Sequence, residues 1–424
     1  MNIVNMKSAI ITSATIKWVR LAAMALGVIA VTAACSDNPL DTTRAESPIA
    51  RDINGLFWLV MIISIVVFVL VQGALIYMSA RYRVKGDPFD DEAVYADEEF
   101  PEQIHGNERL EITWTILPAV LMAVIGVVTL SVLFRLDDVE AQDRQQLDRI
   151  EVVGQQWWWE YHYYTVENPN EAAFVTANDV VIPVGEEVRL QVTSRDVIHS
   201  FWIPRLNGKR DAVPGRVSPW TIEAEAPGRY MGQCTEFCGL SHAYMRMFAV
   251  AIDADEWTVW AQQQMQPQTI PVEGDPGFNG YQVFNANCAI CHSISGVTDV
   301  NADEAVDDFT MYTRPENGTV PDIILDHANQ VSGAAPNLTH LMSRSTFGGS
   351  MFDLYDDPDS LDYATIADAG TLNRADLEAW ILNAPAEKPN AADLVEGSRR
   401  GMPSFTALTD QELDDLVDYL LTLK

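Results

Sequence analysis

Two long apolar runs limit the folds that this chain can adopt. The first covers residues 56–80 and holds no charged side chain, and the second covers about residues 112–134, with Pro118 near its start. Each has the roughly 20 apolar residues that cross about 30 Å of hydrocarbon. The alternative for each run is a buried helix of a soluble domain. We predict a transmembrane helical hairpin over residues 50–136.

Basic residues beside the first run set its orientation. Arg81, Arg83 and Lys85 follow it directly, and positively charged ends stay in the cytoplasm. Two spans then place the N-terminus and everything after Arg135 outside. The sequence therefore predicts a multi-pass protein of the bacterial cell (inner) membrane, with its large C-terminal portion on the outer, periplasmic side.

The N-terminus is typical of an export signal. Basic residues precede an apolar core over residues 21–31, and small residues then precede Cys35. We interpret residues 1–34 as a signal peptide. A lone Cys at this place resembles the lipidated cysteine of bacterial lipoproteins. The alternatives are an ordinary signal peptide or an uncleaved extra membrane segment.

Charge excludes one class of partner. The chain has 27 Lys and Arg against 60 Asp and Glu, a net charge of −33, so nothing would neutralise nucleic-acid phosphates. Hydrophobic residues make up 48% and charged residues 21%, which excludes disorder of the whole chain. The acid excess is either a solvated surface or a docking face for a basic electron donor.

The middle of the chain combines short β-type runs with one loop that is dense in metal ligands. Pro and Gly punctuate the runs between residues 148 and 262, which predicts a small all-β sandwich or barrel. Two thiolates, two imidazoles and a thioether suit copper electron transfer better than a hard cation. One copper rarely needs so many ligands, whereas two coppers bridged by two thiolates would use them all. A disulfide or a zinc site is the alternative. The candidate ligands are His199, Cys234, Glu236, Cys238, His242 and Met245.

The segment Cys234-Thr-Glu-Phe-Cys238-Gly-Leu-Ser-His242-Ala-Tyr-Met245 resembles the dinuclear copper A loop of cytochrome c oxidase subunit II. The resemblance covers roughly residues 50–262 and implies a cupredoxin-like copper A domain over residues 147–262. It implies that Cys234 and Cys238 bridge two coppers, that His199 and His242 each cap one, and that Met245 is a weak ligand. It also implies that Glu236 ligates through its carbonyl, while its side chain reaches a Mg ion at the contact with subunit I.

Three further segments resemble the same family. Trp157 lies in an aromatic segment similar to the one that receives electrons from cytochrome c, although simple core packing is the alternative. Glu111 stands where the family has an acid that opens a proton path into subunit I. The alternatives there are the nearby Glu108 or a solvated acid. Asp211 begins a segment similar to the one that faces subunit I.

The C-terminal region carries a second redox motif. Residues 263–275 are rich in Gln and Pro and are predicted to be a linker. Cys288-Ala-Ile-Cys291-His292 then gives the C-x-x-C-H signal for covalent haem c, with His292 as an iron ligand. A thioredoxin-like pair is the weaker alternative. We select Met402, which precedes Pro403 as in class I cytochromes c, as the sixth ligand. The other candidates are Met311, Met342, Met351, His327 and His340.

The end of the chain favours an all-α class I cytochrome c domain over residues 276–424. Thr409 and Glu412 form a predicted capping box, and apolar residues then recur at helical spacing. In cytochromes c the terminal helix packs across the helix before the haem motif, here around Gly280 and Phe284. Pro336 begins a segment similar to the one beside the proximal His. Residues 296–335 are a long acidic insertion without an assigned role.

Together these features resemble subunit II of a caa3-type cytochrome c oxidase. The resemblance implies a proton-translocating cytochrome-c oxidase in which this chain passes electrons from haem c to copper A and on to subunit I, where oxygen is reduced. Its partners would be subunit I, other oxidase subunits and an upstream donor such as a cytochrome bc complex or a soluble cytochrome c. The alternatives are a nitric-oxide or nitrous-oxide reductase component and a membrane-tethered electron shuttle. With seven His in total, the chain has too few for the large copper-cluster domain of a nitrous-oxide reductase.

Overall fold

The computed structural model describes Gly27 and residues 38–83, 106–137, 147–298, 335–389 and 401–424, apart from residues 168, 361 and 364. Cys35, Met311, His327, most of the 296–335 insertion and the predicted signal peptide apart from Gly27 lie outside these residues.

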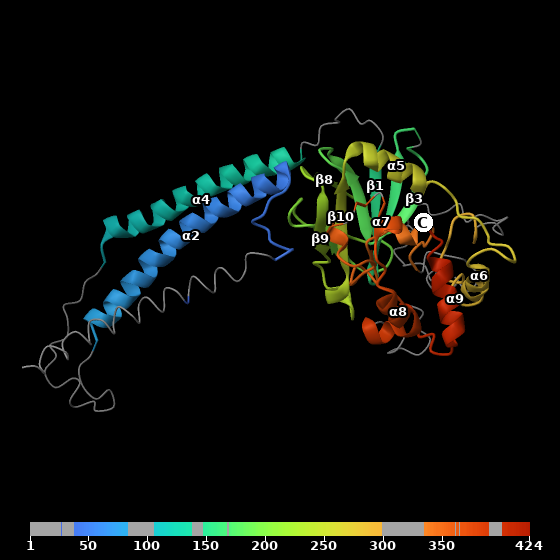
Figure 1. Cartoon of the computed structure of the whole chain (residues 1–424). Helices are drawn as coiled ribbons and strands as arrows, with labels where there is room; N and C mark the ends of the chain where they lie inside the picture. Colours follow the sequence, from blue (N-terminus) through green and yellow to red (C-terminus); the bar gives the residue numbers. More distant parts are fainter. Residues whose placement is uncertain are drawn as a thin grey trace, which may run out of the picture.

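Two long helices carry the apolar runs and lie side by side (Figure 1). Helix α2 spans Pro48–Arg81 and helix α4 spans Glu108–Asp137. Both are long and apolar enough to cross a membrane. Helix α2 begins at the N-cap Ser47, whose hydroxyl accepts a hydrogen bond from Ala50 N and donates one to Leu206 O at 2.5 Å. The start of α2 is therefore bonded to the β-domain that follows.

The predicted β-domain is a sandwich of two main sheets. The larger sheet has the order β3-β2-β1-β5-β8 and the smaller has the order β4-β10-β9. Pairs β1–β5 and β4–β10 are parallel, and the remaining pairs of these two sheets are antiparallel. The strands are β1 (Leu147–Gln155), β2 (Trp158–Thr165), β3 (Phe174–Ala177), β4 (Asp179–Pro183), β5 (Val188–Ser194), β8 (Ser218–Ile222), β9 (Gly228–Gln233) and β10 (Arg246–Ile252).

Two further elements complete this domain. A short pair, β6 (His199–Phe201) with β7 (Arg210–Ala212), holds the upstream His. Helix α5 (Ala254–Gln264) was not expected in an all-β region. It buries Trp257 and Trp260, and the Trp257 indole donates to Val181 O at 3.1 Å, so the helix covers the sandwich at β4.

The C-terminal region contains four helices among the residues described there: α6 (Phe278–Asn287), α7 (Ile366–Ala369), α8 (Arg374–Glu387) and α9 (Asp410–Leu420). It also has a small hairpin, β11 (Thr346–Phe347) with β12 (Phe352–Asp353), which the expectation of a purely helical domain did not include. The capping box of Thr409 and Glu412 at the start of α9 is present.

Helices α6 and α9 cross closely, as the sequence predicted (Figure 1). The crossing is centred on Gly280, where a Cβ atom would lie 1.8 Å from Asp415 O. Tyr419 of α9 packs against both Tyr281 and Phe284 of α6, with ring centroids 5.8 and 5.5 Å away. Only glycine fits at position 280 in this crossing.

Candidate metal centre

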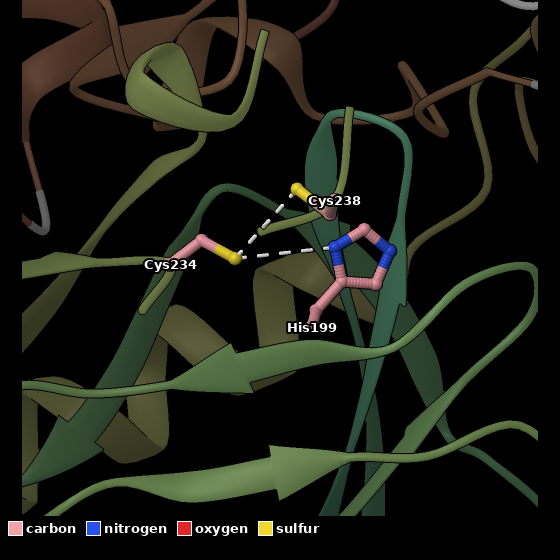
Figure 2. Close-up of side chains that lie close together, drawn as sticks. All are labelled: His199, Cys234 and Cys238. Atoms are coloured by element: carbon pink, nitrogen blue, oxygen red, sulfur yellow. Dashed lines mark hydrogen bonds between the residues drawn. The ribbon is translucent and has the colours of Figure 1, made fainter. Parts of the chain in front are cut away.

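Strand pairing brings the two ends of the ligand-rich loop together. The loop leaves β9 after Gln233 and returns into β10 at Arg246, and these two residues are paired in the sheet. Cys234 N consequently donates to Met245 O at 2.9 Å. Strand β6 contributes His199 from the side, so that ligands from two distant parts of the chain meet (Figure 2).

The candidate ligand atoms face one another. The Sγ atoms of Cys234 and Cys238 are 3.8 Å apart. His199 Nδ1 lies 4.0 Å from the first sulfur and His242 Nδ1 lies 3.5 Å from the second. Met245 Sδ is 4.0 Å from Cys238 Sγ. Each imidazole is thus beside a different sulfur, which is the arrangement that two thiolates bridging two metals would need.

Glu236 contributes through its main chain. Its carbonyl oxygen lies 3.4 Å from Cys234 Sγ. The residue as a whole is exposed to solvent. The two functions that the resemblance implied for this residue, carbonyl at the copper and carboxylate toward a neighbour, are sterically compatible.

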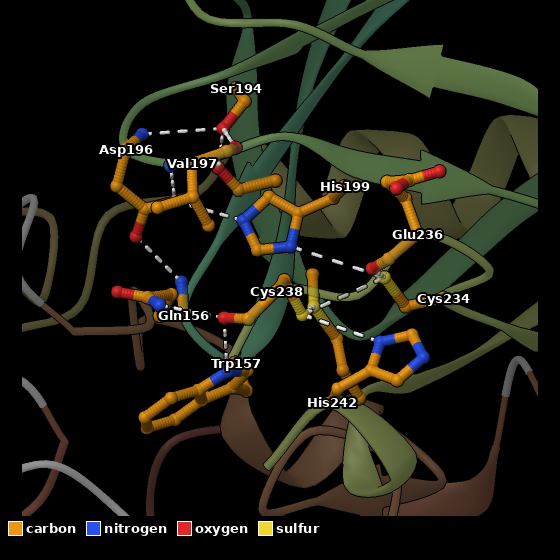
Figure 3. A network of polar contacts seen from close by, with 12 residues as sticks. Gln156, Trp157, Ser194, Asp196, Val197, His199, Cys234, Glu236, Cys238 and His242 are labelled. Atoms are coloured by element: carbon orange, nitrogen blue, oxygen red, sulfur yellow. Dashed lines mark hydrogen bonds and ion pairs between the residues drawn. The ribbon is translucent and has the colours of Figure 1, made fainter. Parts of the chain in front are cut away.

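A carboxylate orients His199, and sequence reasoning had not assigned it a role. Asp196 Oδ1 lies 2.8 Å from His199 Nε2, on the opposite side of the ring from the cysteines (Figure 3). Asp196 also accepts hydrogen bonds from Val197 N and Gln156 N. Burial opposes ionisation of Asp196, but the bond to His199 and the backbone bonds outweigh it and lower its pKa. A carboxylate bound in this way fixes the ring so that Nδ1 faces the sulfurs.

The thiols are electrostatically prepared for metal binding. Both cysteines are buried and neither forms a disulfide. The hydrogen bond from Cys238, followed by that from His199, lowers the pKa of Cys234 to about 4, whereas the same partnership raises the pKa of Cys238. Since a metal binds thiolates, metal binding would release the protons that the pair still holds.

Trp157 lies directly against the ligand-rich loop, residues 234–245, hereafter the copper loop. Its indole Nε1 donates to Cys238 O at 2.9 Å, and the neighbouring Gln156 side chain donates to the same oxygen at 2.7 Å. The Trp157 side chain is 5% exposed. The residue thus has a direct hydrogen-bonded path to one of the two thiolate residues.

The two predicted acids are not among the candidate ligands, although Asp211 lies on the strand that pairs with the strand of His199. Glu111 lies in the first turn of α4, is exposed, and accepts a hydrogen bond from Asn107 N at 3.3 Å. Asp211 is exposed on β7 and accepts from Ser200 Oγ at 2.8 Å. Both are free to face another protein, as their expected contacts with subunit I require.

The C-x-x-C-H motif lies at the end of α6. Neither Cys288 nor Cys291 forms a disulfide, and burial raises the pKa of Cys288 to about 12. His292 Nδ1 is 2.8 Å from Pro336 O, so that the segment expected beside this His is in contact with it. Burial, aided by the charge of Arg344, lowers the pKa of His292, and the neutral ring keeps Nε2 available as a ligand.

The described candidates for a sixth ligand differ in their surroundings. Met402 packs partly buried against the core. His340 is held by main-chain oxygens, with Nε2 2.9 Å from Gln266 O and Nδ1 2.7 Å from Lys424 O. Its two nitrogens thus have structural partners. Met342 is buried beside the Tyr355 hydroxyl.

Arg344 is a second residue that sequence reasoning missed. It is buried, and one of its terminal nitrogens donates to Asn337 O, but Nε has no hydrogen-bond partner among the described residues. Burial lowers its pKa to about 10. Asp179 attracts its charge, and an acceptor at Nε would offset more of the cost of burial. No local pattern marks this residue, because its burial depends on the packing of the whole region.

The fold and the ligand cluster define a class: a membrane-anchored, cupredoxin-like protein whose soft-ligand centre suits electron transfer by copper. Two family profiles match the chain. "Cytochrome C oxidase subunit II, transmembrane domain" matches residues 37–132, and "Cytochrome C oxidase subunit II, periplasmic domain" matches residues 149–252.

Two relatives carry the name of the same family. Cytochrome c oxidase subunit 2 of Alkalihalophilus pseudofirmus is 30% identical over 372 residues, which cover 86% of each chain. The protein of the same name from Bacillus sp. (strain PS3) is 26% identical over 77% of this chain and 78% of its own. Among solved structures, the periplasmic domain of subunit II of the cytochrome oxidase of Bradyrhizobium japonicum is 31% identical, with a TM-score of 0.25 over 28% of this chain and 95% of that chain.

The chain belongs to the cytochrome c oxidase subunit II family, and it functions as subunit II of a haem–copper oxidase. This family binds copper A, and in this chain the residues that could hold it include the His199, Cys234 and Cys238 cluster. The two apolar helices anchor the protein in the membrane, and residues 149–252 form its periplasmic domain.

Proposed function

We propose that the chain is subunit II of a caa3-type oxidase, in which a cytochrome c domain is fused behind the copper A domain. The proposed divisions are a signal peptide at 1–34, a membrane hairpin at 50–136, the copper domain at 147–262, a linker at 263–275 and the cytochrome domain at 276–424. When bound, the haem and the copper pair carry single electrons from an external donor toward subunit I, where oxygen is reduced to water.

One observation carries the copper assignment: two sulfurs lie 3.8 Å apart, with a different imidazole beside each. Cys234 and Cys238 would bridge the coppers, and His199 and His242 would each bind one. Met245 and the Glu236 carbonyl would complete the set. Soft and borderline donors dominate it, which favours copper over a hard cation.

The haem assignment rests on two features of the described C-terminal residues. The Pro336 carbonyl at His292 Nδ1 leaves Nε2 for iron, and this hydrogen bond would fix the ring. Among the described residues, Nε of buried Arg344 has no hydrogen-bond partner, and a haem carboxylate would supply an acceptor in addition to the attraction of Asp179. The alignment with the A. pseudofirmus protein also spans 372 residues, more than residues 1–252 could supply. Cys288 and Cys291 would anchor the haem covalently, and Met402 would be its sixth ligand.

Further roles are proposed for residues at the edges of the copper domain. Trp157 would receive electrons and pass them toward Cys238 through its indole contact. The exposed Glu236 carboxylate would reach a Mg ion shared with subunit I, and Glu111 would open a proton path into subunit I. Electrons would reach this multi-pass protein of the bacterial inner membrane from a cytochrome bc complex or a soluble cytochrome c.

The test is metal content. The full chain, purified in its complex from cells supplied with copper and haem, should carry two coppers and one covalent haem iron that are removed by distinct substitutions. Replacing both Cys234 and Cys238 by Ser should remove two coppers per complex, with the absorption of the copper–thiolate centre, and leave the covalent haem. Replacing both Cys288 and Cys291 by Ala should do the reverse. Covalent haem without copper A in the native chain would contradict the copper assignment, and copper A without covalent haem would contradict the fusion.

A further inference from the structure

A buried carboxylate of the copper domain is bonded entirely by the C-terminal region. Asp179, the first residue of β4, is 1% exposed. Its Oδ2 accepts hydrogen bonds from Ser345 N at 2.7 Å, Ser345 Oγ at 2.6 Å and Tyr363 OH at 3.0 Å. Its Oδ1 accepts from Thr346 Oγ1 at 2.6 Å. Separation of the two regions would break all four of these hydrogen bonds together.

An arginine of the copper domain, Arg229, also binds the C-terminal region. Arg229 of β9 stacks over the Phe248 ring, 4.2 Å from its centroid. Its guanidinium forms ion pairs with Asp353 at 3.1 Å and Asp359 at 2.5 Å, both in the C-terminal region. Since both acids are solvent-exposed, these pairs contribute little free energy, but they set the orientation of the two surfaces.

The contact continues to the edge of the copper loop. The buried Lys388 Nζ donates to Trp157 O at 2.6 Å and to Gly348 O at 2.9 Å. Gly349 has φ +74°, and a Cβ atom there would lie 2.6 Å from Trp157 O. Gly349 O also accepts from Arg246 N at 3.1 Å. Main chain of one region therefore lies against main chain of the other, at the residue whose indole is bonded to Cys238 O.

A flexible connection predicts something different. A linker of about 13 residues that behaved as a random coil would let its ends separate by roughly 20 Å, and the contact would form and break. Here the connecting segment is itself bonded: Gln264 Nε2 donates to Ser343 Oγ at 2.9 Å, and Gln268 N donates to Ser295 O at 2.8 Å.

We propose that residues 343–360 and Tyr363, together with Lys388, lock the C-terminal region onto the copper domain as one rigid unit and close the Trp157 edge of the copper loop to an external donor. The lock depends only on contacts within this chain. The closure to a donor rests on the proposed function, because it presumes that electrons otherwise arrive at Trp157. An external cytochrome would then have to deliver its electron to the C-terminal region.

Hydrogen exchange of the full chain tests the lock. The Ser345 amide donates across the contact, so its protection measures docking directly. We expect strong protection in the native chain. In Gly349→Ala, exchange at Ser345 should accelerate by about tenfold or more, since the added Cβ meets main chain. The matched control is Gly185→Ala, which imposes the same left-handed strain at φ +75° with nothing within 4 Å, and it should leave Ser345 unchanged.

Other amides distinguish undocking from unfolding. In an undocked variant the amides of α9, such as Leu416, stay protected, whereas unfolding of the C-terminal region exposes them too. If Gly349→Ala unfolds the region, Asp179→Asn replaces it, because it weakens the same contact without added volume. Since Asp179 is the acceptor of the Ser345 amide, exchange is then read at the Arg246 amide, which donates to Gly349 O across the contact. Rapid exchange at Ser345 in the native chain, or equal behaviour of the Gly349 and Gly185 variants, would refute the lock.

A kinetic measurement on the assembled oxidase tests the closure. In a rigid unit, the rate of electron transfer from haem to copper is independent of solvent viscosity. In Gly349→Ala, this rate should fall as glycerol is added. A native rate that falls with viscosity would show a searching domain and refute the proposal. If the chain lacked haem or copper, the proposed function would fail while the exchange measurement still decided the lock.

Discussion

Replacing Asp196 by asparagine tests whether a residue that touches no metal controls the copper centre. The native carboxylate accepts three hydrogen bonds, two at Oδ1, from His199 Nε2 and Val197 N, and one at Oδ2, from Gln156 N. An asparagine can keep the oxygen toward His199 only by turning its NH₂ group toward the Gln156 N–H. One hydrogen bond is then lost, two donors face each other, and the charge that favours the ligating tautomer disappears.

The expected cost follows from these contacts. Loss of an outer partner of a metal-bound His typically lowers metal affinity by about 10- to 100-fold, which is about 1.4–2.7 kcal/mol. Copper affinity is measured by competition with a chelator, following the absorption of the copper–thiolate centre. The control is Asp148→Asn, in the same domain but about 23 Å away along β1, where the acid pairs with Arg149. Copper affinity of Asp196→Asn equal to that of Asp148→Asn would refute the argument.

Three further outcomes are expected. Gly280→Ala should destabilise the C-terminal region by about 1–3 kcal/mol or more in thermal unfolding, because its Cβ would lie 1.8 Å from Asp415 O; an unchanged Tm would mean that α6 and α9 are not in contact. Glu160 is buried, and although burial opposes its charge, Arg195 and His162 lower its pKa from 4.5 to about 2. Its ionised form therefore adds on the order of 3 kcal/mol to the free energy of unfolding above pH 4.5, and this contribution is lost as the pH falls toward 2. In denaturant unfolding, Glu160→Gln should be less stable than the native chain at pH 7 and equal to it near pH 2. A constant difference in stability across this range would contradict the prediction. Met402→Ala should lower the haem reduction potential in a redox titration, because Met ligation raises it; an unchanged potential would direct attention to Met342 or Met351.

Local sequence patterns predicted the features that depend on neighbouring residues. The spacing from Cys234 to Met245 indicated one compact soft-ligand site, because strand pairing returns such a loop to its own start. The apolar runs predicted α2 and α4, and the Thr409 capping box marked the start of α9. Each of these signals is contained in a short stretch of chain.

Features that join distant stretches could not be predicted in this way. Asp196 acts on His199 through a loop geometry that spacing alone does not reveal. The bonds of Asp179 to Ser345 and Thr346 link residues 166 and 167 positions apart, and each residue alone is typical of a solvated surface. Likewise, α5 carries two Trp residues that are buried only because the sandwich ends beneath them.

The N-cap of α2 links the tilt of this helix to the orientation of the β-domain. Because Ser47 bonds both to the first turn of α2 and to Leu206 O, and Arg51 pairs with Glu225, the helix cannot change its tilt without turning the β-domain with it. Membrane helices tilt when the thickness of the hydrocarbon layer changes. A change in the thickness of the hydrocarbon layer would therefore act on the orientation of the β-domain as well as on that of the helix.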